Sequence, residues 1–185
     1  KQLKKLGVRD SKQLTPARRS ELARELKTFP HAIYFAQAPE INSIMQRGVS
    51  LNEFEAKIIA GLIDELAKTR AVKAFVDSPD SIPKKFEHRI RKYLHTQIEI
   101  VSENKADVNH VCVGAASILA KTERDKQIEE IKRTLDFDFG NGYPSDENTQ
   151  EFVRKHAGEE RLKPFLRTEW ETVKRLKNHQ VKLGE

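Results

Sequence analysis

Apolar segments of strand type alternate along this chain with segments of helical periodicity, and this alternation restricts the fold more than any other feature. The expected strands cover residues 32–38, 71–77 and 97–101. The expected helices cover residues 17–27, 50–68, 83–95, 107–135, 149–156 and 167–177. The first of these helices is marked by a hydroxyl N-cap, Thr15, followed by Pro16. Helices between successive apolar strands are typical of a parallel sheet, so the sequence predicts an α/β fold.

The sequence contains only three expected strands but six expected helices. A sheet contains about five or six strands on average, whereas only the three segments above have strand character in this sequence. The sequence also begins at Lys1 and not at an initiator methionine. We therefore expect that strands which precede Lys1 in the complete fold are absent from this chain.

The net charge, the hydropathy and the cysteine content indicate the kind of partner and the cellular compartment to expect. The chain carries 34 Lys and Arg against 28 Asp and Glu, a net charge of +6, which suits a polyanionic partner without requiring one. No stretch approaches the roughly 18 consecutive apolar residues of a membrane span. The single cysteine, Cys112, excludes an internal disulfide and favours a reducing compartment. We expect a cytoplasmic protein that does not interact with membranes.

Two carboxylates occupy positions typical of a functional site. Asp77 ends the apolar strand 71–77, and Asp107 begins the long helix 107–135. Sites in α/β sheets form at the carboxyl ends of strands, and carboxylates delivered there by different elements suit a divalent cation. The residues alone also allow simpler roles: Asp77 could cap a turn, and Asp107 could be a plain helix N-cap.

Short motifs, in order over nearly the whole chain, resemble type 2 ribonuclease H (ribonuclease HII) of the archaeal kind. Each motif is short, and their order and spacing carry the resemblance. The matching segments are residues 8–15 (VRDSKQLT), 75–77 (FVD), 105–107 (KAD), 115–121 (AASILAK), 124–125 (RD), 142–146 (GYPSD) and 166–170 (LRTEW).

This resemblance implies a ribonuclease H-like mixed sheet flanked by helices over residues 1–139, with a small helical extension, residues 140–185, packed on it. It implies a monomeric, metal-dependent endoribonuclease. Such an enzyme hydrolyses the RNA strand of RNA–DNA hybrids and cleaves at ribonucleotides embedded in duplex DNA, leaving 5′-phosphate and 3′-hydroxyl ends. Two Mg²⁺ or Mn²⁺ ions about 3.5–4 Å apart could supply the water, the charge relief and the leaving-group stabilisation for this reaction.

The sequence departs from the family at one motif. The family's first strand carries Asp-Glu-Ala-Gly-Arg-Gly, which supplies two of its four catalytic carboxylates, and this motif does not occur here. Glu53 and Glu103 are conceivable substitutes, but no spacing argument places them at the site. Two alternatives therefore stay open: a catalytically inactive nucleic-acid-binding fragment of such an enzyme, or another nuclease of the same fold.

The resemblance also assigns roles to individual residues. Asp77 and Asp107 match the family's third and fourth carboxylates and would bind metal. Lys12 would approach the backbone near the scissile bond, and Tyr143 would stack against the sugar at the cleavage point. Asn52 is a candidate from its position alone: it lies in the first turn of its helix, where free N–H groups favour an anion such as a substrate phosphate, but it could also be a plain polar residue of that turn.

Asp125 is a weaker candidate. In an unbroken helix it would lie about 27 Å from Asp107 at about 1.5 Å per residue. An ion pair with Lys121, one turn earlier, is the simpler role.

Overall fold

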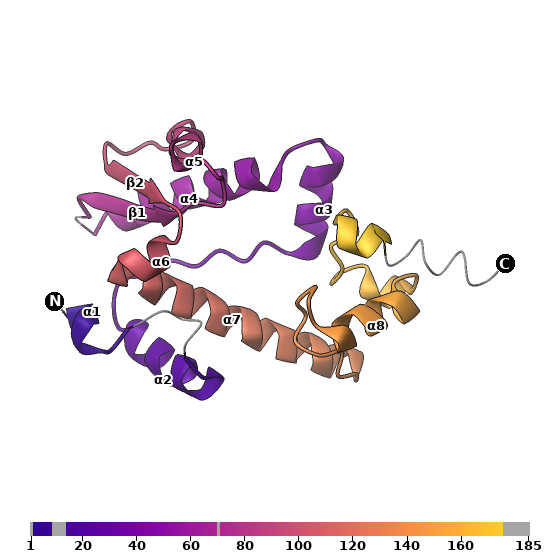
Figure 1. Ribbon diagram of the computed structural model, residues 1–185. Helices are drawn as coiled ribbons and strands as arrows, with labels where there is room; N and C mark the ends of the chain where they lie inside the picture. Colours follow the sequence, from indigo (N-terminus) through magenta and orange to yellow (C-terminus); the bar gives the residue numbers. More distant parts are fainter. Residues whose placement is uncertain (1, 9–13, 70, 176–185) are drawn as a thin grey trace. The chain divides into compact units, whose positions relative to one another are not determined.

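The computed structural model describes residues 2–8, 14–69 and 71–175 (Figure 1). The chain forms two compact units. The first contains residues 1–34 and 52–124, and the second contains residues 35–51 and 125–185. The division into residues 1–139 and 140–185 stays a prediction. No helix among the described residues is long and apolar enough to cross a membrane.

A two-stranded parallel sheet lies in the first unit. Strand β1 (Lys73–Asp77) pairs with β2 (Glu99–Glu103) in a register that runs from Lys73 opposite Glu99 to Asp77 opposite Glu103. Helix α5 (Pro83–Arg91) provides the crossover between them. Two of the expected strands are thus confirmed. Because the first and last residues of β1 lie opposite the first and last residues of β2, both strands end at the same edge of the sheet, and Asp77 lies at this edge.

The expected strand 32–38 is wrong. Residues 32–37 form no strand, and helix α3 (Ala38–Gln46) begins where the strand was predicted to end. Pro39 lies in the first turn of α3, where its fixed φ angle favours helix. A strand also requires a hydrogen-bonded partner, and in the described part of the chain β1 and β2 pair only with each other.

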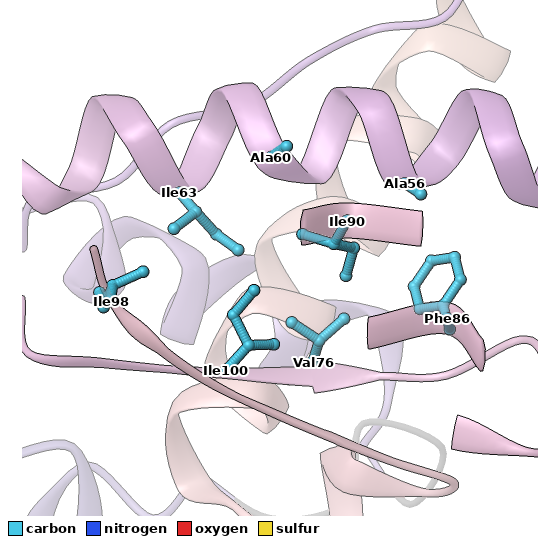
Figure 2. Close-up of a cluster of buried hydrophobic side chains, with 8 residues drawn as sticks. All are labelled: Ala56, Ala60, Ile63, Val76, Phe86, Ile90, Ile98 and Ile100. Carbon is cyan, nitrogen blue, oxygen red and sulfur yellow. The ribbon is translucent and has the colours of Figure 1, made fainter. Parts of the chain in front are cut away.

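One hydrophobic core of the first unit lies between the sheet and two helices. Helix α4 (Leu51–Ala67) confirms the expected helix 50–68. Figure 2 shows α4 facing the strands, with side chains of α5 completing the cluster. The buried residues are Ala56, Ala60, Ile63, Val76, Phe86, Ile90, Ile98 and Ile100. This packing fixes the position of β1 and hence of the carboxylate at its end.

A separate core joins α2 (Pro16–Leu26) to the first half of α7 (Val111–Leu135). Thr15 is the N-cap of α2, as predicted, and its hydroxyl accepts a hydrogen bond from the Arg18 N–H at 3.3 Å. The short helix α1 (Gln2–Lys5) precedes α2. The buried members of this core are Val8, Leu22, Ala23, Leu26, Ala115, Ile118 and Leu119.

The expected single helix 107–135 is interrupted. It consists of α6 (Ala106–Asn109) and α7, separated by His110, whose backbone is extended at φ −122° and ψ 115°. The His110 ring stacks on Phe75 at a centroid distance of 4.1 Å, and its Nε2 lies 3.0 Å from Glu103 Oε2. These contacts with β1 and β2 favour the break over a continuous helix. The separation of Asp107 and Asp125 estimated for an unbroken helix therefore does not apply.

The second unit is helical. It contains α3, the second half of α7, α8 (Glu147–His156), the 3₁₀ turn Glu160–Leu162 and a helical turn at residues 171–175. Helix α8 confirms the expected helix 149–156. Of the expected helix 167–177 only residues 171–175 are helical among those described. The core of this unit includes Leu135, Phe139, Phe152 and Leu162.

Asp64 of α4 makes acid-sensitive contacts with the loop before β2. Burial acts to raise the pKa of Asp64, but hydrogen bonds from the Thr96 hydroxyl and from the His95 and Thr96 N–H groups lower it overall. A carboxyl group whose pKa is lower in the folded state than in the unfolded state stabilises the fold at pH values above its unfolded pKa. This stabilisation is lost as the pH falls through the folded-state pKa. We expect Asp64→Asn to reduce the free energy of unfolding by about 1 kcal/mol at pH 7.

Urea unfolding as a function of pH checks this expectation. The difference between the two proteins should shrink as the pH falls below about 4, where the unfolded carboxyl is protonated. A difference that stays constant down to pH 2.5 would contradict the role of the charge.

Candidate metal and phosphate site

The carboxylate of Asp77 lies against the start of α6. Its Oδ1 accepts a hydrogen bond of 2.9 Å from the main-chain N–H of Ala106, and Ala106 is fully buried. Asp107 is the next residue and is half-buried, whereas Asp77 is exposed. The structure therefore brings both candidate ligands to the same edge of the sheet, Asp77 as the last residue of β1 and Asp107 in the first turn of α6.

Glu103 shares this edge but is already bound. It lies opposite Asp77 in the sheet register. Its carboxylate contacts His110 Nε2 at 3.0 Å and accepts a longer contact of 3.4 Å from Asn109 Nδ2. The hydrogen bond with His110, followed by that with Asn109, lowers the pKa of Glu103. His110 and Asn109 therefore already bind the Glu103 carboxylate, which the sequence analysis considered as a substitute metal ligand.

Glu55 is a neighbouring carboxylate that the sequence analysis did not identify. Desolvation raises its pKa, and the negative charges of Asp77 and Asp80 raise it further. Glu55 lies three residues after Asn52 and hence on the same face of α4, which is the signal that could have identified it. The two carboxyl groups of Glu55 and Asp77 therefore lie close enough to influence each other.

The donor set is small but suits a hard cation. Among residues 2–8, 14–69 and 71–175, no three His, Cys, Asp or Glu side chains gather closely enough to hold a metal ion. Mg²⁺ is commonly bound by one or two carboxylates together with waters and substrate phosphates. Asp77 and Asp107 fit that pattern of few protein oxygens.

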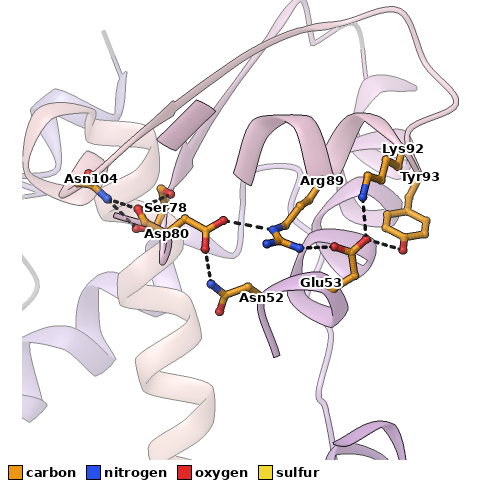
Figure 3. Close-up of polar contacts among 8 residues, drawn as sticks. All are labelled: Asn52, Glu53, Ser78, Asp80, Arg89, Lys92, Tyr93 and Asn104. Carbon is orange, nitrogen blue, oxygen red and sulfur yellow. Dashed lines mark hydrogen bonds and ion pairs between the residues drawn. The ribbon is translucent and has the colours of Figure 1, made fainter. Parts of the chain in front are cut away.

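Asn52 belongs to a network of polar side chains, shown in Figure 3. Its Nδ2 donates to Asp80 Oδ1 at 2.5 Å, and Asp80 Oδ2 accepts from Arg89 Nε at 3.3 Å. Arg89 Nη1 in turn donates to Glu53 Oε2 at 2.5 Å. An amide group carries two N–H donors, so one bond to Asp80 orients Asn52 without using its whole donor capacity.

Glu53 has a structural role in this network. Its Oε1 accepts from the Tyr93 hydroxyl at 2.8 Å and lies 3.6 Å from Lys92 Nζ. The hydrogen bond from Tyr93, followed by that from Arg89, lowers the pKa of Glu53. Glu53 therefore joins α4 to α5 and to the two residues that follow α5.

Tyr143 lies in the second unit, in the loop between α7 and α8. The residue is 43% exposed, and its N–H donates to Asn141 Oδ1 at 2.9 Å. The loop is fastened by Asp146, whose Oδ2 accepts from the Asn141 N–H at 2.5 Å. Gly140 has φ +87°, and a Cβ there would lie 2.0 Å from Asp146 Oδ2, so only glycine fits. The remaining candidate, Lys12, lies outside the described residues.

Comparisons with known proteins find similar sequences over most of the chain. A family model described as ribonuclease HII matches residues 1–173. Ribonuclease HII of Thermofilum pendens is 42% identical over 184 residues, which cover 95% of this chain and 84% of the relative.

Two solved structures are similar to this fold. The PCNA:RNase HII complex from Archaeoglobus fulgidus gives a TM-score of 0.83 at 34% identity, covering 95% of this chain and 83% of that chain. The ribonuclease H2 from Pyrococcus horikoshii gives a TM-score of 0.82 at 34% identity, covering 98% of this chain and 85% of that chain.

Proposed function

Because this chain belongs to the ribonuclease HII family of endoribonucleases, which act on RNA–DNA hybrids, we propose that Asp77 and Asp107 bind the divalent metal for cleavage. Its fold is the ribonuclease H-like α/β fold, as predicted. The family is metal-dependent. We propose further that the site binds two Mg²⁺ or Mn²⁺ ions. We also propose that the protein cleaves both RNA–DNA hybrids and duplex DNA at embedded ribonucleotides.

One observation carries the proposal for the two aspartates. The Ala106 N–H donates to Asp77 Oδ1 at 2.9 Å, so the Asp77 carboxylate lies beside the residue that precedes Asp107. Two carboxylates, one at the end of a strand and one in the first turn of a helix, can ligate ions that also bind the scissile phosphate. Hydrolysis needs an aligned water, charge relief on the phosphate and a stabilised 3′-oxygen, and bound divalent ions supply all three.

The protein's other proposed contacts position the substrate. Asn52 would donate an amide N–H to a phosphate oxygen, with Asp80 fixing the orientation of the amide. Lys12 would contact the backbone near the scissile bond. Tyr143, exposed on a loop held by Asp146, would stack on the sugar at the cleavage point. Phosphate contacts of this kind fix register and orientation on a duplex.

A second candidate is a nucleic-acid-binding protein without cleavage activity. The observation in its favour is the small donor set: the described residues contain no cluster of three or more metal-ligating side chains. Binding through phosphate contacts weakens with salt but does not require a divalent ion. The two candidates therefore differ in their dependence on metal.

The test is cleavage of a DNA duplex that contains one ribonucleotide, with Mg²⁺, Mn²⁺ or EDTA in parallel reactions. We expect nicking beside the ribonucleotide in both metals, no nicking in EDTA, and none in a matched all-DNA duplex. Salt-sensitive binding without nicking in either metal would overturn the enzymatic proposal and favour the second candidate.

Tyr143→Ala is expected to lower kcat by about tenfold, equivalent to about 1.4 kcal/mol of transition-state stabilisation. Duplex affinity should change little, because phosphate contacts supply most of it. Single-turnover cleavage and fluorescence anisotropy measure the two quantities. Tyr143→Phe, which keeps the ring, is the control and should retain cleavage. Equal losses of rate and affinity in Tyr143→Ala would indicate a purely structural tyrosine.

A further inference from the structure

The loops that follow β1 and β2 are fastened together by the side chain of Asn104 (Figure 3). Its Nδ2 donates to the main-chain carbonyl of Ser78 at 3.1 Å and to that of Asp80 at 2.8 Å. The first loop begins directly after Asp77, and Asn104 lies three residues before Asp107. One amide group thus bridges the two segments that carry the candidate metal ligands.

Main-chain contacts align these segments with Asn104. The Ser78 N–H donates to the Glu103 carbonyl at 2.8 Å, which extends the sheet pairing one residue past Asp77. The Ser78 hydroxyl donates to the Asp80 carbonyl at 3.1 Å, so this carbonyl accepts from two side chains. An acceptor-only side chain at position 104 would leave both carbonyls facing another acceptor.

The backbone conformation of Lys105, the residue after Asn104, has to be held in place by its neighbours. Lys105 has a left-handed backbone with φ 58°, a conformation that is unfavourable for a non-glycine residue and persists only where its surroundings hold it. This turn allows the following Ala106 N–H to bond to Asp77 Oδ1. Asn104 holds the turn on one side and Asp77 holds it on the other.

The loop after β1 is also held from its far side. The Asp80 carboxylate binds Asn52 of α4 and Arg89 of α5, as described above. Asn104 is therefore the side chain that connects this fixed loop to the turn before α6. Loss of its two hydrogen bonds would leave the turn before α6 without this connection to the loop after β1, held by the Asp77–Ala106 bond and the Ser78–Glu103 main-chain bond.

We propose that Asn104 is a positioning residue, which sets the placement of Asp107 relative to Asp77 for metal binding. This inference rests on the proposed function, because it takes the two aspartates as the ligands. Asn104 is itself exposed, so its hydrogen bonds contribute little to global stability. Its effect is expected in metal affinity, where loss of an outer partner of the ligands costs about 10- to 100-fold.

The experiment compares Asn104→Leu, which keeps the approximate shape without donors, and Asn104→Ala with the unsubstituted chain. Isothermal titration with Mn²⁺ should give a Kd about 10- to 100-fold higher in both variants. The Mn²⁺ concentration for half-maximal cleavage should rise by the same factor. At saturating Mn²⁺, kcat should return to within about threefold of the unsubstituted value, since the ligands themselves remain.

Thr96→Val is the matched control. It removes a side-chain hydrogen bond of 2.8 Å, from the Thr96 hydroxyl to Asp64 Oδ1, at the opposite end of β2. We expect it to leave the Mn²⁺ affinity unchanged. Unchanged affinity in both Asn104 variants, with affinity lost in Asp77→Asn, would overturn the inference alone. Unchanged affinity in Asp77→Asn would overturn the proposed metal site and the inference with it.

Discussion

Asp107→Asn is expected to lower kcat for cleavage at an embedded ribonucleotide by about 100- to 1000-fold. The substitution keeps the shape of the side chain but removes its negative charge. With few protein ligands available among the described residues, the loss of one charged ligand should weaken the metal and the charge relief it gives. Metal catalysis of this type supplies several kcal/mol, and about 3–4 kcal/mol corresponds to the stated factor.

The measurement is single-turnover nicking over a range of Mg²⁺ and Mn²⁺ concentrations, with duplex binding followed separately by anisotropy. Binding should persist, because phosphate contacts that do not involve Asp107 carry it. Asp77→Asn should behave in the same way. Asp125→Asn is the matched control: it is an identical chemical change about 21 Å along α7 from the first residue of that helix, and it should cleave normally. A full cleavage rate in Asp107→Asn would remove this residue from the site.

Ile90→Ala is expected to lower the free energy of unfolding by about 2–5 kcal/mol. Ile90 of α5 is fully buried among side chains of α4, β1 and β2. The substitution deletes buried methyl and methylene groups and leaves a cavity that the surrounding helices and strands fill only in part. Urea unfolding followed by circular dichroism gives the free-energy difference, with the slope of the transition as a check on two-state behaviour.

Ile82→Ala is the matched control for this loss. The chemical change is identical, but Ile82 precedes α5 and is 49% exposed, so the expected cost is below about 1 kcal/mol. Equal destabilisation by the two substitutions would contradict the assignment of this core. At temperatures where Ile90→Ala stays folded, its metal affinity should equal that of the unsubstituted chain, which separates stability from the site.

Local patterns predicted most of the helices correctly. Thr15 and Pro16 mark the start of α2 because capping and the fixed proline φ angle are properties of adjacent residues. The apolar spacing of α4 reports the face that packs on the sheet. Segment 32–38 has strand composition but no partner strand among the described residues, and composition alone does not reveal whether a partner exists.

The break at His110 had no local signal of this kind. Residues 107–135 have helical composition throughout, and the interruption follows from the contacts of His110 with Phe75 and Glu103. Phe75 is distant in the sequence and comes within stacking distance only when β1 and β2 pair. A periodicity argument cannot include a contact that the tertiary fold creates.

The sequence by itself determined that Asp77 ends a strand and that Asp107 lies in the first turn of a helix, because both follow from the residues immediately around them. Only the tertiary structure decided which groups orient them. The Ala106 N–H bonds to Asp77 across 29 residues, and Asn104 reaches Ser78 across 26 residues. Such bonds depend on the register of β1 and β2, which is set when α4 and α5 pack on the sheet and bury its apolar face.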